Sequence, residues 1–268
     1  MTARLRVTIL GSGSSGGVPR FGGPDGMGDW GACDPDEPKN RRSRCSILVQ
    51  REHPEYGFAP NKVTSVLVDT SPDMRAQLLA ARCSRLDAVL YTHDHADQSH
   101  GIDDLRVFAL QMRRRIPVYI DDETGGAIVD RFHYCFEQAP GSYYPPILER
   151  KNMPSCGEAF AIDGPSGPIP VTAFLQYHGG VNSLGFRFGD IAYSSDAVGL
   201  PEDSFATLSG VKVWIVDALQ YKPHKTNQWV CNAHFNNQRL HLFGPGYILS
   251  NNIRNNHYIL GILHDIYS

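Results

Sequence analysis

The sequence lacks the features that mark membrane proteins and small secreted domains. It has no run of about 18 apolar residues, so it predicts no transmembrane helix. Its first residues lack the pattern of a signal peptide, which is a charged region followed by an apolar region and a cleavage site. Its six cysteines are widely spaced and include no Cys-x-x-Cys pair, unlike a disulfide framework. We therefore expect a cytoplasmic protein with no membrane partner.

An excess of charge of one sign is also missing. The chain has 25 Lys+Arg against 28 Asp+Glu and a formal net charge of −3, so it has no general attraction for nucleic acid. A nucleic-acid partner is therefore not favoured, and a phosphate-bearing partner has to be met by a local basic cluster or a metal. Residues 41–44 and 113–115 are such basic runs. Each either attracts a phosphate-bearing substrate toward the site or is an ordinary solvent-exposed charged surface.

The remaining composition is that of an ordinary globular protein. With 268 residues, 41% of them hydrophobic, the chain forms one large domain or two small ones. Short β-branched runs bounded by turn residues predict strands in both halves, with helices between them, and this indicates an α/β fold with two sheets packed face to face. The expected strands are residues 4–10, 45–50, 64–69, 86–92, 116–120, 160–163, 170–175, 184–188, 191–195 and 211–219, and the expected helices are 72–82, 102–112 and about 126–136.

The C-terminal segment has a different composition from the rest of the chain. Residues 223–268 hold one acidic residue, Asp265, while the preceding part holds the other 27. We therefore divide the chain into a main domain at 1–222 and an atypical segment of the same domain at 223–268. Two explanations stay open: a genuine but unusual C-terminal subdomain, or a segment altered by a reading-frame change near Lys225.

A glycine-rich loop follows the first expected strand. Residues 11–16 fit Gly-x-Gly-x-x-Gly, but the GVPRFGGPDG that follows cannot open the helix that a dinucleotide site requires. The chain also has no Gly-Lys-Ser/Thr, which excludes a P-loop. We instead expect Ser12, Ser14 and nearby backbone amides to line the edge of an active site and to meet a substrate phosphate.

The segment His93-Asp94-His95-Ala96-Asp97 carries the strongest chemical signal. It follows a buried strand, so its side chains project from the loop at the strand's carboxyl end. Two imidazoles and a carboxylate at this spacing can converge on one or two divalent metals. We expect a metal site here.

This segment and its surroundings resemble the metallo-β-lactamase superfamily, whose motif is HxHxDH. Within that superfamily, the chain is similar to the phosphodiesterase branch that includes ribonuclease Z and phosphoribosyl cyclic phosphodiesterase. The resemblance runs from about residue 4 to 224 and rests on GSGSSGGVP, VDTSPD, YTHDHADQSHGIDDLR, QYHGGVNSLGFRF, AYSSDAVGLPE and WIVDAL, in that order. It implies a four-layer αββα sandwich with zinc or manganese at one edge.

The resemblance also implies a ligand set. His93, His95 and His178 would hold the first metal, Asp97 would hold the second metal and position the nucleophile, and Asp196 would bridge the two. Asp97 and Asp196 are therefore the expected catalytic carboxylates.

The chain departs from the family pattern on the side of the second metal. Gln98 stands where the motif has its last histidine, and His100 is the nearest substitute. An amide oxygen is a weaker ligand than imidazole for zinc or manganese. The family's final histidine would correspond to His264 or His257, and Asn227 stands where the family has an active-site histidine.

The resemblance implies metal-dependent hydrolysis of a small phosphodiester, such as a cyclic nucleotide-like or phosphoribosyl phosphate. Two other readings stay open. One is hydrolysis of a thioester or lactam on the same fold, and the other is a metal- or nucleotide-binding protein with impaired catalysis. A homodimer is also compatible with the apolar VFALQM stretch and the Tyr-rich loop.

Overall fold

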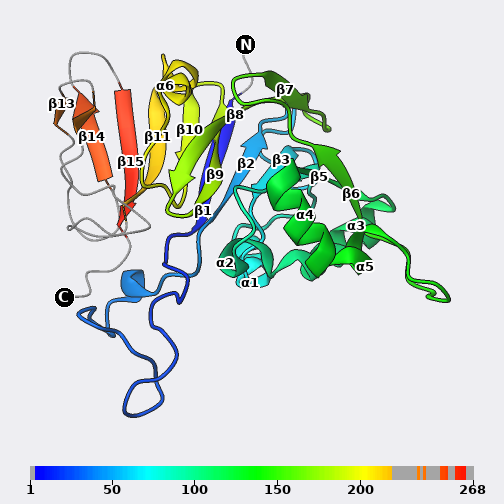
Figure 1. Cartoon of the computed structure of the whole chain (residues 1–268), viewed down its shortest axis with the longest axis horizontal. Coiled ribbons are helices and arrows are strands. Elements are labelled where there is room, and N and C mark those ends of the chain that lie inside the picture. The colour runs from blue at the N-terminus through cyan, green and yellow to red at the C-terminus, as the bar shows by residue number, and fades with distance from the viewer. Residues whose placement is uncertain (1–3, 219–233, 236–237, 240–247, 253–256, 264–268) are drawn as a thin grey trace. The chain divides into compact units, whose positions relative to one another are not determined.

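The computed structural model describes residues 4–218, 234–235, 238–239, 248–252 and 257–263 (Figure 1). The chain separates into two compact units, and most residues of the first come from one stretch, 45–154. The first unit contains residues 1–11, 45–154 and 160–170, and the second contains residues 12–44, 155–159 and 171–268. In the described parts of the chain, no helix is long and apolar enough to cross a membrane.

The first unit is built on a six-stranded sheet in the order β1-β2-β3-β4-β5-β6. The pairs β1–β2 and β2–β3 are antiparallel, and the remaining pairs are parallel. The central strands β3 and β4 are buried at every position. The strands are β1 (Leu5–Gly11), β2 (Ser46–Arg51), β3 (Thr64–Val68), β4 (Ala88–Leu90), β5 (Ile116–Ile120) and β6 (Leu148–Asn152).

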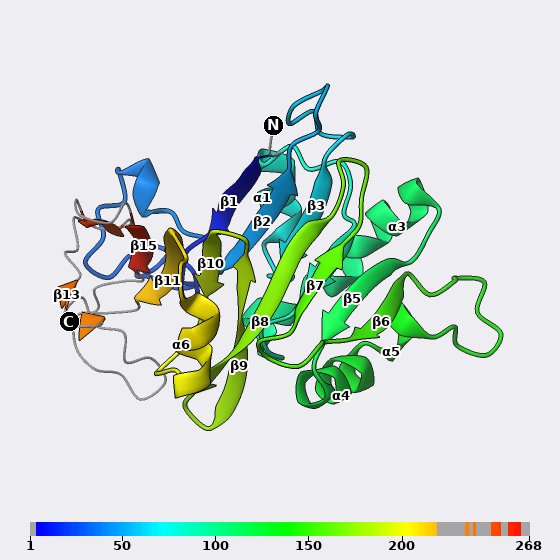
Figure 2. The same ribbon diagram turned by 90° about the horizontal axis from the view of Figure 1, so that it is seen from above.

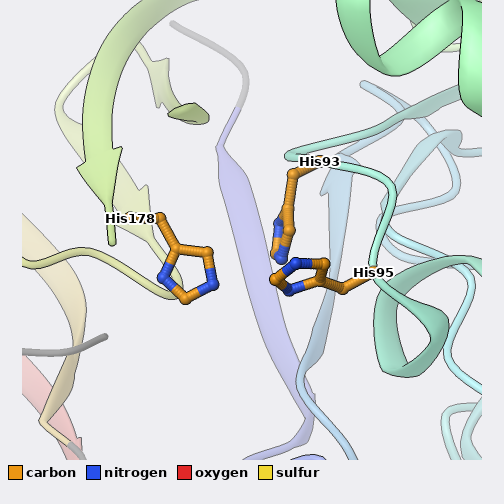
Figure 3. A group of neighbouring side chains, drawn as sticks. All are labelled: His93, His95 and His178. Carbon is orange, nitrogen blue, oxygen red and sulfur yellow. The ribbon is translucent and has the colours of Figure 1, made fainter. Parts of the chain in front are cut away.

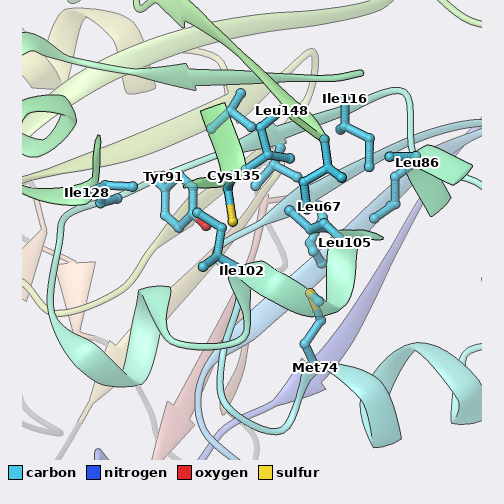
Figure 4. Close-up of a cluster of buried hydrophobic side chains, with 14 of the residues drawn as sticks. Leu67, Met74, Leu86, Tyr91, Ile102, Leu105, Ile116, Ile128, Cys135 and Leu148 are labelled. Atoms are coloured by element: carbon cyan, nitrogen blue, oxygen red, sulfur yellow. The ribbon is translucent and has the colours of Figure 1, made fainter. Parts of the chain in front are cut away.

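Helices pack against one face of this sheet. They are α1 (Met74–Ala80), α2 (Ala96–Ser99), the 3₁₀ helix η2 (Ile102–Leu105), α3 (Arg106–Met112), α4 (Asp122–Arg131) and α5 (His133–Phe136). Apolar side chains from all of these helices except α2 meet those of the strands in one cluster, in which Met74, Leu105 and Ile128 from the helices join Leu67 and Leu148 from the sheet (Figure 4). This core fixes the carboxyl end of β4, from which the HxHxD loop leaves.

The second unit contains most of a seven-stranded sheet in the order β14-β15-β11-β10-β9-β8-β7. Helix α6 (Glu202–Leu208) packs on this sheet (Figure 2). Its Leu208 clusters with Phe174 and Trp214. The strands are β7 (Ala159–Ile162), β8 (Ile169–His178), β9 (Val181–Phe188), β10 (Ile191–Ser194), β11 (Val213–Ala218), β14 (Ile248–Asn252) and β15 (His257–Leu263), with a separate pair β12 (His234–Phe235) and β13 (Gln238–Arg239) and a short 3₁₀ helix η1 (Pro38–Asn40).

The elements expected from the sequence are present, but several differ in their bounds, and the strand expected at 86–92 spans only Ala88–Leu90. Helix α1 begins at Met74 rather than at residue 72, and its N-cap Asp73 makes no side-chain capping bond. The helix expected at 126–136 begins at Asp122, because the Asp121 carboxylate caps it by accepting from the Thr124 amide at 2.8 Å, and it is broken near Phe132 into α4 and α5. Strand β6 was not expected, since its charged Glu149-Arg150-Lys151 lacks an apolar pattern.

Candidate metal centre

The HxHxD loop leaves the sheet at the carboxyl end of β4 and leads directly into α2. His93 is buried at 1% exposure, while His95 is exposed and is the N-cap residue of α2. The two imidazole rings meet edge to face with their centroids 4.5 Å apart. The spacing of two residues therefore directs both rings to one place.

A buried hydrogen-bond chain orients His93. The Asp69 carboxylate accepts from the Thr92 amide at 2.8 Å and from the Thr92 hydroxyl at 2.9 Å, and the Thr92 oxygen lies 2.9 Å from His93 Nδ1. The hydroxyl has one proton, which it donates to Asp69, so it must accept from Nδ1–H of His93. This assigns the protonated nitrogen of His93 to Nδ1 and leaves the Nε2 lone pair for a metal.

An arginine holds the middle of the loop. Arg131, at the end of α4, donates to the Asp94 carbonyl at 2.8 Å and to the Asp94 carboxylate at 3.0 Å. Asp94 lies between the two histidines, so this two-point contact restrains the backbone that carries them.

His178 is the last residue of β8, and its side chain is buried at 6% exposure. The same unit holds the segment of Asp196 in place, because the Ser183 hydroxyl donates to the Asp196 carbonyl at 3.1 Å and the Gln176 amide donates to the Ser195 carbonyl at 3.0 Å. Asp196 has a φ of +42°, in the left-handed region. A non-glycine residue in that region is uncommon and costs free energy, and such residues are frequent at functional sites.

The ligand nitrogens of His93, His95 and His178 lie within 4.8 Å of one another (Figure 3). Three imidazoles are the donor set typical of a catalytic zinc, which keeps a fourth position open for water or substrate. The donor chemistry therefore fits a divalent metal.

The other expected ligands lie outside this histidine group. Among the described residues, neither Asp97 nor Asp196 belongs to it. The Gln98 side-chain amide donates to the Asp97 carboxylate at 3.4 Å, and the His100 ring packs edge to face on Phe132 with centroids 5.5 Å apart. His264 lies outside the described residues.

The glycine-rich loop is anchored by close backbone contacts. The Gly13 amide donates to the Ser43 carbonyl at 2.7 Å, and a Cβ on Gly13 would lie 2.7 Å from the Arg42 carbonyl oxygen, so only glycine fits there. The Ser14 hydroxyl is buried with no hydrogen-bond partner among the described residues, whereas Ser12 is half-buried. A buried hydroxyl without a partner is what a phosphate-binding group would leave when no ligand is bound.

Sequence reasoning did not single out Asp69, Thr92 or Arg131. Asp69 belongs to the VDTSPD segment and has a φ of +62°, but nothing in its spacing links it to a threonine 23 positions later. These supporting contacts come from the packing of the sheet and its helices rather than from a local pattern.

Comparison with known proteins places the chain in a family. Residues 64–242 match the model of the Beta-lactamase superfamily domain, and the chain belongs to that family. Its fold class is the mixed α/β metallo-β-lactamase fold with two sheets, as expected from the sequence. This is the superfamily that the sequence resembles.

Three individual relatives are informative. The crystal structure of a new diphosphatase from the PhnP family is 30% identical, with a TM-score of 0.65, covering 84% of this chain and 79% of that one. The zinc-bound PqqB from Methylobacterium extorquens is 19% identical with a TM-score of 0.60, covering 90% of this chain and 82% of that one, and it shares the fold. A protein named octanoyltransferase from Porphyromonas gingivalis (strain ATCC BAA-308 / W83) is 30% identical over 236 residues, which are 85% of this chain and 42% of the relative. The chain thus spans less than half of that relative.

Proposed function

We propose that the protein is a metal-dependent phosphodiesterase that cleaves a small phosphodiester, such as a cyclic nucleotide-like or phosphoribosyl phosphate. The observation that carries the proposal is the convergence of His93, His95 and His178. The 30% identity to a diphosphatase over most of both chains supports phosphorus as the centre that is attacked.

The three histidines would hold the first metal, either zinc or manganese. A divalent metal at such a site lowers the pKa of a water molecule toward about 7 and stabilises charge on phosphoryl oxygens. The chain's own residues supply orientation: Thr92 and Asp69 fix the His93 ring, and Arg131 fixes the loop between the histidines.

The carboxylates and the glycine-rich loop complete the proposal. Asp97, beside the Gln98 amide, would orient the attacking water and hold a second metal, and Asp196 would bridge the two sites. Ser14 and Ser12 would donate hydrogen bonds to the substrate phosphate. Gln98 in place of histidine makes the second metal the weaker of the two.

The proposal is tested with bis(p-nitrophenyl) phosphate and protein reconstituted with zinc or manganese. We expect turnover by the wild-type chain, and loss of bound metal together with at least about a 100-fold loss of rate in His95→Ala and Asp196→Ala. His133→Ala, which removes an exposed histidine of α5, is the matched control and should retain the wild-type rate. An unchanged rate in His95→Ala would refute the assignment.

Acyl hydrolysis is the second candidate, because the relative from Porphyromonas gingivalis is named octanoyltransferase. The chain matches only 42% of that protein, so its name does not say which part carries the activity. An octanoyl thioester of N-acetylcysteamine, assayed beside the phosphodiester, separates the two. Turnover of the thioester alone would replace our proposal with the acyl one.

A further inference from the structure

A buried polar cluster of the second unit lies against the backbone of Asp196. Gln176 on β8 and Ser183 on β9 are partners in the pairing of these two strands, and both side chains are buried. The loop that carries Asp196 directly follows β10. Buried polar side chains need hydrogen-bond partners, and this pair finds them in the backbone of that loop.

Each hydrogen bond of the cluster has a defined direction. The Gln176 side-chain nitrogen donates to the Ser195 carbonyl at 3.0 Å and to the Ser183 hydroxyl at 3.1 Å. A carbonyl only accepts, so the nitrogen and not the oxygen of the Gln176 amide must face it. Because the Ser183 hydroxyl accepts from Gln176, its own proton is left for the Asp196 carbonyl, 3.1 Å away. One chain of hydrogen bonds therefore fixes the carbonyls on both sides of the Asp196 Cα atom.

The strand end that carries His178 is joined to the same loop. The Tyr177 amide donates to the Gly199 carbonyl at 2.9 Å, and the Tyr177 carbonyl accepts from the Val198 amide at 2.6 Å. Tyr177 directly precedes His178 in β8. The backbone of β8 therefore restrains the loop beyond Asp196 as well.

Two features of the cluster cost folding free energy. The φ of +42° at Asp196 places a non-glycine residue in the left-handed region. The Gln176 side-chain oxygen is buried and accepts no hydrogen bond from the described part of the chain. A Cβ on Gly185 would lie 2.8 Å from that oxygen, so a glycine of β9 leaves the room that Gln176 occupies. A core selected for stability alone avoids such costs, and their coincidence beside one carboxylate indicates a functional role.

We propose that Gln176 and Ser183 are positioning residues of the hydrolytic site, which hold the backbone of Asp196 in the conformation that presents its carboxylate to the metals. The inference rests on the proposed function, in which Asp196 bridges the two metals. The side chains of Gln176 and Ser183 are buried at 0% and 1% exposure, so each acts through Asp196 and not on the substrate.

The test compares two buried serines that each donate one hydrogen bond to a backbone carbonyl of the second unit. Ser183→Ala removes the bond to the Asp196 carbonyl. Ser204→Ala is the matched control, because it removes a bond of 2.7 Å to the Leu175 carbonyl and leaves the contacts of Asp196 in place. Each variant loses a bond of the same kind, so we expect similar midpoints in urea unfolding.

Only Ser183→Ala should also change the site. We expect its zinc affinity, measured by competition with a chelating indicator, to fall about tenfold or more. Its kcat on bis(p-nitrophenyl) phosphate should fall about tenfold, with KM within about twofold of the wild type. Gln176→Met keeps the length of the side chain without its donors and should behave in the same way. Ser183→Thr keeps the hydroxyl and should restore both zinc affinity and kcat to within a few-fold of the wild type.

The positioning role and the proposed function fail in different ways. A wild-type chain without turnover would contradict the proposed function, and the zinc affinities would still decide the positioning role. Wild-type zinc affinity and kcat in Ser183→Ala and Gln176→Met, beside their loss in Asp196→Ala, would overturn the positioning role alone. Equal losses of zinc affinity in Ser183→Ala and Ser204→Ala would also overturn it, because the effect would then be one of general packing.

Discussion

At the scale of single residues, Thr92 controls the orientation of His93. Its hydroxyl donates to the Asp69 carboxylate and accepts from His93 Nδ1. The buried carboxylate therefore restrains the ring of the candidate ligand His93 through Thr92. Hydrogen-bond partners of this kind fix the tautomer and ring orientation of metal-binding histidines. A substitution that removes the hydroxyl but keeps the shape should therefore weaken metal binding without unfolding the protein.

We expect Thr92→Val to lower zinc affinity about 10- to 100-fold, as measured by competition with a chelating indicator. Thr92→Ser keeps the hydroxyl and should bind zinc within a few-fold of the wild type. Equal zinc affinity in Thr92→Val and the wild type would mean that His93 does not depend on this chain of hydrogen bonds.

Three cysteines of the described residues should differ in reactivity for a physical reason. Burial raises the pKa of the Cys83 thiol to about 11 and that of the Cys135 thiol to about 11, whereas Cys156 of the second unit is exposed. Only the thiolate reacts with alkylating reagents. At a pH below the pKa, the thiolate fraction falls about tenfold for each unit by which the pH lies below the pKa.

At pH 8 we therefore expect iodoacetamide to label Cys156 at least about 100-fold faster than Cys83 or Cys135, as followed by peptide mass spectrometry. Labelling of Cys83 and Cys135 should rise steadily as the pH is raised from 8 toward 11, because deprotonation supplies the nucleophile. Rapid labelling of Cys135 at pH 8 would contradict the prediction that burial raises the pKa of its thiol.

At the scale of elements, Gly101 sets how closely η2 approaches the loop after β3. A Cβ at this position would lie 2.1 Å from the Ser71 carbonyl oxygen, and the Gly101 amide donates to the Thr70 carbonyl at 2.8 Å. Both contacts are to backbone in a buried region, so the clash cannot be relieved by turning a side chain.

Gly101→Ala should lower the free energy of unfolding by about 2 kcal/mol or more in urea titrations. Gly126→Ala in α4 is the matched control, because no atom lies within 4 Å of its Cβ, and it should stabilise the protein by up to about 1 kcal/mol. Similar midpoints for the two variants would contradict the close packing at Gly101.

The elements also show which parts of the fold a sequence can predict. Strand β3 is buried at every position and contains the apolar run Val66-Leu67-Val68, which predicts a strand. Strand β6 carries three consecutive charged residues and is recognised only through its pairing with β5, which depends on residues more than 25 positions away. The same distinction holds for the candidate site: the HxHxD spacing is local, while the contacts of Asp69 and Arg131 join distant segments.

At the scale of the whole molecule, the candidate metal ligands come from widely separated parts of the sequence. His93 and His95 follow β4, and His178 ends β8. The family resemblance predicts that His178 joins His93 and His95, whereas the spacing of these residues in the sequence does not. The roles of Asp97, Asp196 and Gln98 as metal ligands remain predictions. The predicted boundary between the main domain and the C-terminal segment, at residue 222, also remains a prediction, because most of that segment lies outside the described residues.

A ligand that binds only the folded chain stabilises it by mass action, so metal binding should be visible in thermal unfolding. At about 100 times its dissociation constant, zinc should add about 2.7 kcal/mol, which raises Tm by about 5–10 °C for a chain of this size. Removal of metal with a chelator should reverse the shift. Manganese should need a higher concentration for the same effect, because imidazole binds it less tightly than zinc.

The His178→Ala variant decides whether the shift comes from the histidine group. It removes one of the three imidazoles and should lose most of the zinc-dependent increase in Tm, while His133→Ala should keep it. Because the readout is stability rather than turnover, it tests the metal site independently of the substrate. A zinc-dependent increase of equal size in His178→Ala would show that zinc binds elsewhere on the chain.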